Sequence, residues 1–403
     1  MGGPTRVRVL GPLEEFAEGC QAELASLGYS PRTSEAQLYL LKHLSAWLAT
    51  QGLTAGDLTV EVVEEFLIAR RGRYSKLRSA RALDPLLRYL RRRGAAPTAP
   101  AVVPVGAVEV LAEQFAEYLS TQRGLAPETV RSYLSQVRPF LDRHASLDGG
   151  WGSLTARQVA GFVTDRAADL SPRSVAVGAN ALRALLRWMW REGMVPSPLA
   201  DSVWSVAAWI GTAVPRSLST EQVHELFAAL PAPGPVRLRD EAMLALMHRL
   251  GLRAGEVASL RLDDIDWRIG VLMVRGKGAR HEQLPLPVDV GKLLAGYLRR
   301  GRPAATAHRQ VFLAVDAPHH ALAGCAVSSV ASRALFRAGI PGPGAAHRLR
   351  HTAACRVLAE GGGLVEAGQL LRQTSPASTA VYAKADLTAL AVLARPWPVE
   401  VTR

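Results

Sequence analysis

The segment Leu250-Gly-Leu-Arg253-Ala-Gly-Glu256-Val-Ala-Ser-Leu260 decides how the last part of this 403-residue chain is interpreted. Glu256 follows Arg253 by three residues, about one helical turn, so a helix would bring the carboxylate and the guanidinium together. On its own the pair has two interpretations. It is either a structural ion pair of little consequence, or an arginine that a carboxylate orients for use in a site.

The residues around this segment predict a mostly helical block with one short sheet, over residues 216–403. Ser219 or Thr220 can cap a helix with Glu221 in its first turn, and helices are expected to about Leu262. The run Val271-Leu-Met-Val, a Gly-Lys-Gly turn at 276–278 and the run Glu282-Gln-Leu-Pro-Leu predict a β-hairpin or the first strands of a small sheet. After it the chain returns to helices.

Two Pro/Ala-rich stretches, residues 95–106 and 196–215, predict linkers that divide the chain into blocks 1–95, 106–200 and 216–403. The first two blocks look like copies. Gly28-x-x-Pro31-x-Thr33 recurs 96 residues later as Gly124-x-x-Pro127-x-Thr129, and Leu86-Leu-Arg-Tyr recurs 99 residues later as Leu185-Leu-Arg-Trp. Two helical domains of one kind, with four or five short helices each, are therefore expected in tandem.

The charge balance predicts a polyanionic partner. The net charge is +13, the pI is about 10.3, and only five of the 48 basic residues are lysines. Nucleic acid is the first candidate and an anionic membrane the second. The end of the first block is dense in base, and its candidates for DNA binding are Arg70, Arg71, Arg73, Lys76, Arg78, Arg91, Arg92 and Arg93. A solvated helix face is the alternative for this run.

The cysteines and the apolar runs predict a protein of the reducing cytoplasm. Cys20, Cys325 and Cys355 are too few and too scattered for a disulfide framework or a zinc cluster. Glu14 and Glu15 interrupt the first apolar stretch, so no signal peptide is expected. The run of residues 202–215 is too short to cross a bilayer.

Four signatures in order resemble the catalytic domain of the tyrosine recombinases, the phage-integrase family, from about Leu218 to Asp386. They are Gly-Leu-Arg253-x-x-Glu256, Lys277 in its Gly-Lys-Gly turn, His347-x-x-Arg350-His351, and Tyr382 in Ser-Thr-Ala-Val-Tyr. Taken singly, each has a structural interpretation, such as a turn lysine, a helix cap or a core aromatic. Residues 108–194 resemble the family's helical core-binding domain. The implied fold is mainly α: two tandem core-binding, SAM-like domains followed by a mostly helical catalytic domain with a small β-sheet.

The resemblance implies a site-specific DNA recombinase that cleaves and rejoins DNA through a 3′-phosphotyrosine, without metal or energy cofactor. Tyr382 would attack the scissile phosphate, because a covalent phosphotyrosine conserves the phosphodiester energy. Arg253 and Arg350 would clamp the charge that grows on the phosphate oxygens. Lys277 would protonate the departing 5′ oxygen as general acid, and His347 would assist proton transfer from the phenol. Glu256 would orient Arg253, and His351 would support the site.

One position departs from the family pattern. Nine residues before the tyrosine, where the family usually has His or Trp in a Leu-Leu-Gly-His-like run, this chain has Gln373 after Leu370-Leu-Arg. A glutamine amide can donate a hydrogen bond to the phosphate but cannot carry a proton. Gly361-Gly-Gly, shortly before, is expected to loosen a helix junction.

The leading hypothesis is the integrase or transposase of a mobile element, which binds double-stranded DNA and assembles as a tetramer on paired sites. Sister recombinases are possible partners, and a membrane is not. The alternative is a catalytically impaired recombinase-fold protein that binds DNA as an accessory subunit, which Gln373 and the glycine run favour. Relaxation of supercoils by the same chemistry is a third hypothesis.

Overall fold

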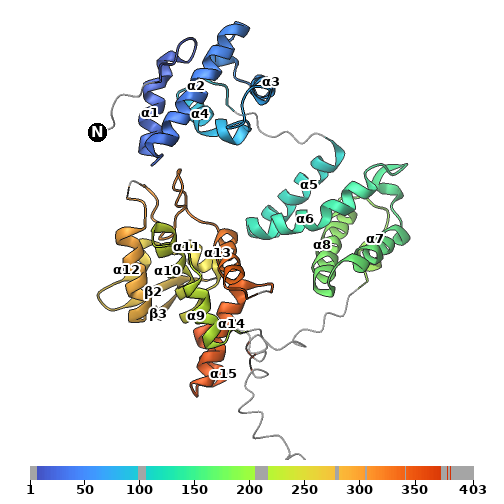
Figure 1. Cartoon of the computed structure of the whole chain (residues 1–403). Helices are drawn as coiled ribbons and strands as arrows, with labels where there is room; N and C mark the ends of the chain where they lie inside the picture. Colours follow the sequence, from blue (N-terminus) through green and yellow to red (C-terminus); the bar gives the residue numbers. More distant parts are fainter. Residues whose placement is uncertain are drawn as a thin grey trace, which may run out of the picture. The chain divides into compact units, whose positions relative to one another are not determined.

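The computed structural model describes residues 7–98, 106–204, 217–276, 281–304, 306–340, 342–373, 379 and 382, and these residues are mostly helical (Figure 1). The first block contains α1 (Ala17–Ser26), α2 (Pro31–Gln51), α3 (Val60–Arg71) and α4 (Ala80–Arg92), with short 3-10 turns at Glu14–Phe16 and Ala55–Asp57. The second contains α5 (Ala107–Glu117), which continues as a π-helix over Tyr118–Gln122, then α6 (Pro127–His144), α7 (Ala156–Asp169) and α8 (Pro172–Arg191), with 3-10 turns at Gly150–Ser153 and Leu199–Ser202. The expectation of a mainly α fold is confirmed.

The first two blocks begin their helices at matching places. The α2 and α6 helices start at Pro31 and Pro127, and α3 and α7 start at Val60 and Ala156, so both pairs keep the offset of the repeat. The residue before α3 and the residue before α7 are threonines whose hydroxyls accept a hydrogen bond from the backbone N–H three residues on, at 3.4 Å in each case. The same caps thus start the same helices twice, which supports tandem copies.

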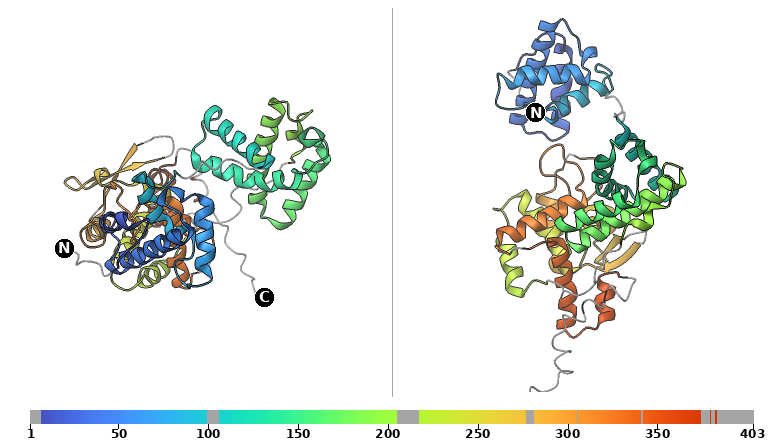
Figure 2. Two further views of the ribbon diagram at one scale, coloured as in Figure 1. Left: turned by 90° about the horizontal axis from the view of Figure 1, so that it is seen from above. Right: turned by 90° about the vertical axis from the view of Figure 1, so that its right-hand side faces the viewer.

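Each predicted block buries its own apolar core. One cluster draws on residues 9–96, the second on 108–203 and the third on 218–349. Backbone proximity groups residues 100–212 into one compact unit and residues 1–99 with 213–403 into another. The division into three domains stays a prediction. Figure 2 shows the helices of each block from two further directions. Among the described residues, no helix combines the length and the apolar character needed to cross a membrane.

The third block packs around the middle of one helix, α10 (Pro235–Arg249). It contains α9 (Thr220–Ala228), α10 (Pro235–Arg249), α11 (Ala254–Ser259), a 3-10 turn (Leu262–Asp264), β1 (Ile265–Asp266), β2 (Val271–Arg275), β3 (His281–Pro285), α12 (Val288–Arg300), α13 (Gly324–Arg337), α14 (Ala345–Ala359) and α15 (Leu364–Leu370). Residues 242–247 of α10 are all buried, because α12 and α14 both pack against this helix.

The three strands form one antiparallel sheet in the order β1-β2-β3. Val271 pairs with Pro285 and Val274 with Glu282. The sheet turns Leu272 and Val274 of β2 into the core and leaves the alternate residues partly exposed, as the period of a strand requires. The expectation of a small sheet here is confirmed. Residues 277–280, which include Lys277, lie outside the described residues.

A left-handed turn at Gly251 separates α10 from α11 and places Arg253 just before the helix, not within it as the sequence suggested. Gly251 has φ +59°, which only glycine adopts without strain. A Cβ atom there would lie 2.6 Å from Cδ2 of Leu371 and 3.5 Å from Cβ of Ala353. The backbone of this turn therefore touches both α14 and the residue that follows α15, and these contacts hold three distant segments together.

Replacing Gly251 by alanine should lower the free energy of unfolding by more than the same change at Gly270. Both glycines have positive φ, +59° and +67°, so both alanines cost about 1 kcal/mol of backbone strain. Only Gly251 also meets a crowded site, which adds about 1–3 kcal/mol of overpacking, because nothing lies within 4 Å of a Cβ at Gly270. Urea denaturation of the two variants measures the difference. Equal midpoints would contradict the packing described for Gly251.

Candidate active site

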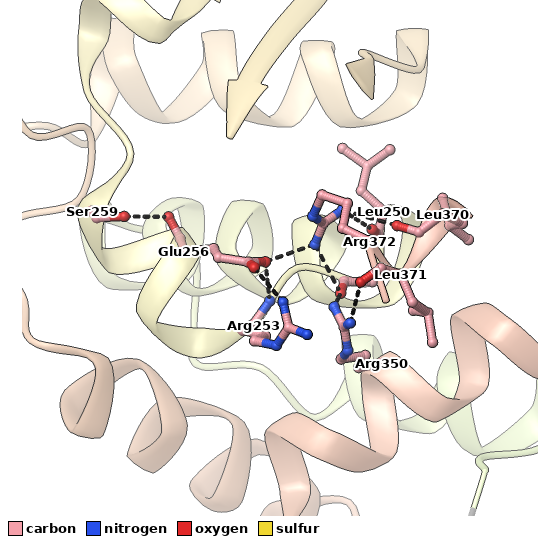
Figure 3. A network of polar contacts seen from close by, with 9 residues as sticks. Leu250, Arg253, Glu256, Ser259, Arg350, Leu370, Leu371 and Arg372 are labelled. Atoms are coloured by element: carbon pink, nitrogen blue, oxygen red, sulfur yellow. Dashed lines mark hydrogen bonds and ion pairs between the residues drawn. The ribbon is translucent and has the colours of Figure 1, made fainter. Parts of the chain in front are cut away.

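The carboxylate of Glu256 joins two arginines from distant parts of the chain (Figure 3). Its Oε2 accepts the backbone N–H of Arg253 at 2.8 Å and Nη2 of Arg372 at 2.7 Å. Its Oε1 accepts Nη1 of Arg253, also at 2.7 Å. Only 6% of the Glu256 side chain is exposed. Burial alone would raise its pKa, but the charge of Arg372 and the hydrogen bonds from Arg253 outweigh burial, so the pKa lies below its usual value. The carboxylate is ionised at neutral pH.

Arg350 is fixed by backbone carbonyls. It lies on α14, is buried, and donates from its two Nη atoms to the carbonyl oxygens of Gly251 and Leu371. Each Nη carries two hydrogens, so within the described residues one hydrogen on each remains for a ligand. Burial, followed by the charges of Arg253 and Arg372, lowers the pKa of Arg350 to about 10. The guanidinium therefore stays charged at neutral pH and cannot rotate freely.

The cluster carries more positive than negative charge. Three guanidinium groups, those of Arg253, Arg350 and Arg372, surround the single carboxylate of Glu256. The side chain of Arg253 is 42% exposed, whereas that of Arg372 is only 3% exposed. Arg253 thus presents charge to solvent while the other two groups are buried behind it. Such a cluster is suited to an anion with several oxygens, such as a phosphodiester.

Arg372 is a residue of the site that the sequence did not single out. Its φ is +53°, a left-handed conformation in which the family-like Leu-Leu-Gly-His run would have glycine. Besides Glu256, its Nη1 donates to the carbonyl of Leu370 at 2.9 Å. The only signal in the sequence is a charged residue directly after the apolar pair at 370–371, at a place where the pattern calls for glycine.

Tyr382 lies in the same region as these arginines. Its ring is 1% exposed and packs against Ala354, Ala367 and Leu371. Its Oη is 2.8 Å from Nδ1 of His351, the residue after Arg350 on α14. Burial raises the pKa of the phenol, and the Arg350 charge, a hydrogen bond with Gln373 and the Arg253 charge oppose that rise.

Gln373 has its amide oxygen occupied, since Oε1 accepts the hydroxyl of Thr379 at 2.9 Å. Gln373 also acts on the phenol of Tyr382, where it opposes the rise in pKa that burial causes. The glycines before it form an ordered turn. Gly362 N–H donates to the carbonyl of Val357 at 2.9 Å, and Gly363 N–H donates to Glu366 at 3.0 Å. The loosened junction expected from the sequence is thus replaced by a hydrogen-bonded one.

Of the other expected residues, His347 is exposed on α14, with its ring centroid 6.3 Å from that of His351. Lys277 lies outside the described residues. The structure thus brings together Arg253, Glu256, Arg350, His351, Gln373 and Tyr382, although more than 100 residues separate the first of them from the last. In the part of the chain that the structure describes, no three His, Cys, Asp or Glu side chains gather so as to hold a metal ion.

Most of the basic run of the first block is exposed, and several of its members also make contacts within the block. Arg70 is 7% exposed, donates to the carbonyl of Leu77 at 2.8 Å and lies 4.4 Å over the ring of Tyr74, so it serves the structure of the block. Arg71 pairs with Glu64 and Arg92 with Glu23, while Arg91 donates to the Pro97 carbonyl at 3.1 Å. The remaining candidates, Arg73, Lys76, Arg78 and Arg93, have exposed side chains.

Replacing Arg372 by methionine should lower the free energy of unfolding by about 3 kcal/mol, because it leaves Glu256 buried with one partner fewer. The control is Arg309→Met. Arg309 pairs with Asp263, and both side chains are more than half exposed, so its loss should cost less than about 1 kcal/mol. Urea denaturation measures both. Equal losses of unfolding free energy would show that the buried pair contributes no more to stability than the exposed pair.

Two family models match the chain. The phage integrase family matches residues 216–388, and the phage integrase N-terminal SAM-like domain matches residues 112–193. The integrase/recombinase y4rA of Sinorhizobium fredii is 36% identical over 402 residues, which are 99% of this chain and 96% of that protein. The tyrosine recombinase XerC of Oceanobacillus iheyensis is 30% identical over 284 residues, 68% of this chain and 91% of that protein.

Solved structures show the same fold. The XerH site-specific recombinase bound to its palindromic difH substrate matches with a TM-score of 0.57 at 16% identity, over 96% of this chain and 99% of that one. A lambda integrase dimer bound to a COC′ core site matches with a TM-score of 0.52 at 18% identity, over 73% of this chain and 99% of that one. The relatives support a site-specific recombinase and not the alternative of an accessory protein. The chain belongs to the phage integrase family, the tyrosine recombinases, which catalyse DNA cleavage and rejoining.

Proposed function

We propose that this chain is an active recombinase that cuts double-stranded DNA at a defined site and rejoins it through a phosphotyrosine at Tyr382. The observation that carries the proposal is the meeting of a tyrosine hydroxyl with a guanidinium cluster of net positive charge. The Arg350 and Arg253 charges both act on the phenol of Tyr382, which the chain brings to them from the far end of the catalytic block. These contacts support a site in which Tyr382 is the nucleophile and the two arginines are the donors that stabilise its transition state.

In the proposed reaction, Tyr382 Oη attacks the scissile phosphorus and the bond to the 5′ oxygen breaks. Negative charge grows on the two nonbridging oxygens, and the unused hydrogens of Arg350 and the exposed guanidinium of Arg253 bind it. Because Glu256 and the carbonyls of Gly251 and Leu371 already fix these groups, they need little reorganisation when the charge develops.

Lys277 is proposed as the general acid that protonates the 5′ oxygen, and His347 as a second group at the phosphate. The exposure of His347 on α14 agrees with a contact to bound DNA. The amide of Gln373 is proposed to donate to the same phosphate, as the ring N–H of the usual His or Trp would. Rejoining is the reverse reaction, so neither step needs an energy cofactor.

The partners proposed are double-stranded DNA and further copies of the chain. Solved relatives include a recombinase bound to a palindromic substrate and a lambda integrase dimer on a core site. Strand exchange between two sites requires two protomers on each, so we propose a tetramer, alone or with sister recombinases. A role as the integrase or transposase of a mobile element, acting in the cytoplasm, fits the integrase/recombinase that matches nearly the whole chain.

The three blocks are proposed to act as an additional DNA-binding domain (1–95), a core-binding domain (106–200) and a catalytic domain (216–403). The XerC match covers only 68% of the chain, whereas the y4rA match covers 99% and so includes the first block. Within the first block, the exposed basic residues Arg73, Lys76, Arg78 and Arg93 are proposed to contact DNA phosphates.

The double change Arg73→Gln and Lys76→Gln should flatten the dependence of log affinity for duplex DNA on log salt. Each phosphate that the protein no longer neutralises lowers the slope by about 0.9. The control is Arg32→Gln with Lys42→Gln, which removes the same charge from exposed positions of α2 outside the basic run. Filter binding over a salt series measures both slopes. The same slope for both variants would contradict a DNA-contacting surface at this run.

Replacing Tyr382 by phenylalanine should abolish covalent attachment to nicked duplexes that carry the sequences flanking the gene, while DNA binding stays intact. Only the attacking hydroxyl is lost. The control is Tyr297→Phe, which removes another buried hydroxyl of the same block, one that accepts a hydrogen bond from Leu313 N–H at 3.3 Å. Gel electrophoresis under denaturing conditions separates the covalent product. Covalent product from the Tyr382 variant would sink the proposed mechanism.

A further inference from the structure

The phenol of Tyr382 lies against the second histidine of α14 and not the first. His351 Nδ1 is 2.8 Å from Tyr382 Oη, and the two ring centroids are 5.4 Å apart. His347, the histidine of the family signature, precedes His351 by one helical turn and is exposed. The ring nitrogen at hydrogen-bond distance from the nucleophile thus belongs to His351.

The protonation states of the two groups allow the hydrogen bond to run from the phenol of Tyr382 to the imidazole of His351. The phenol is buried and protonated, since burial raises its pKa. The pKa of His351 is lowered, first by burial and then by the charges of His347 and Arg350 on the same helix, so its ring is neutral at neutral pH. A neutral ring has one nitrogen able to accept. With Nδ1 accepting from Tyr382, the ring hydrogen is on Nε2.

We propose that His351 is the general base that takes the proton of Tyr382 during attack. The inference rests on the proposed function and adds an assignment to it. As Oη bonds to phosphorus and the bond to the 5′ oxygen breaks, the phenol proton passes to Nδ1 of His351. Lys277 meanwhile gives a proton to the 5′ oxygen. On rejoining, the 5′ hydroxyl attacks, its proton returns to Lys277, and His351 returns its proton to the phenol oxygen.

The surroundings of the phenol oxygen match this proton path. Gln373 opposes the rise in the pKa of the phenol, and its amide oxygen already accepts from Thr379, so its N–H₂ group is the end that can stabilise the phenol oxygen once the proton has left. Arg350 adds positive charge nearby. Gln373 itself cannot accept the proton, so in this chain the residue at the usual His or Trp position leaves that role to another group. Among the described residues, His351 is a titratable group at hydrogen-bond distance from the phenol, so it can take the proton.

The test combines removal of the base with a more acidic nucleophile. His351→Gln should slow single-turnover covalent attachment to the nicked flanking-sequence duplex by at least about 100-fold, the low end of what a general base contributes. Replacing Tyr382 by 3,5-difluorotyrosine in the His351→Gln protein should restore at least about tenfold of that loss, because the acidic phenol needs no base. DNA binding, measured in parallel, should not change.

His347→Gln is the matched control, since it removes the neighbouring histidine of the same helix. Fluorination of Tyr382 should not rescue it beyond its effect on the unaltered protein. If His351→Gln fails to bind DNA, His351→Ala with imidazole in solution replaces it, and added imidazole should restore attachment.

Three results would overturn the role of His351. The first is an attachment rate of His351→Gln within about fivefold of the rate of the unaltered protein. The second is a rate above that of the unaltered protein. The third is no rescue of the rate by fluorination or imidazole. Faster attachment would mean that the hydrogen bond holds Tyr382 in an inactive position and does not activate it. Attachment through a residue other than Tyr382 would instead overturn the proposed function. The two failures are thus distinguished by mapping the residue that carries the DNA.

Discussion

The carboxylate of Glu256 is the interaction on which the site depends. It holds Arg253 by backbone and side chain and Arg372 by its guanidinium, and it does so almost without exposure to water. Removing one partner of such a buried ion pair destabilises the fold mainly because the other charge is then left buried without a counter-charge. Loss of Glu256 would leave three guanidinium groups facing each other. The turn at Gly251, whose carbonyl Arg350 also uses, is held in place by the same network.

In the proposed mechanism, the arginines bind the phosphate because other groups of the chain already orient them. Each arginine is oriented by a group that is not the substrate: Glu256 for Arg253, and the carbonyls of Gly251 and Leu371 for Arg350. Donors fixed before the reaction stabilise growing charge with little reorganisation. Burial of the Tyr382 phenol raises its pKa, so the hydroxyl is protonated at neutral pH. The proposed reaction would therefore start from fixed guanidinium groups and a protonated tyrosine.

Much of this could be predicted from the sequence. Helical spacing, the cap at Ser219 and the apolar run Val271-Leu-Met-Val before the Gly-Lys-Gly turn depend on local chemistry, so the helices and the small sheet could be predicted from them. The partnership of Arg253 with Glu256 is also local. The role of Arg372 was missed, because a left-handed arginine is indistinguishable from a surface arginine until its distant carboxylate is in place. The contact of His351 with Tyr382 and the burial of Arg70 likewise depend on segments that meet only in the fold.

The central claim is that one tyrosine, held beside this arginine cluster, carries the DNA during the reaction. Protein trapped on a nicked duplex can be digested with protease and nuclease, and the peptide that retains a nucleotide can be sequenced by mass spectrometry. The account predicts a single modified peptide, with Tyr382 linked to a 3′-phosphate, and a free 5′ hydroxyl on the other DNA end. A nucleotide on any other residue, or a linkage through a 5′-phosphate, would contradict it.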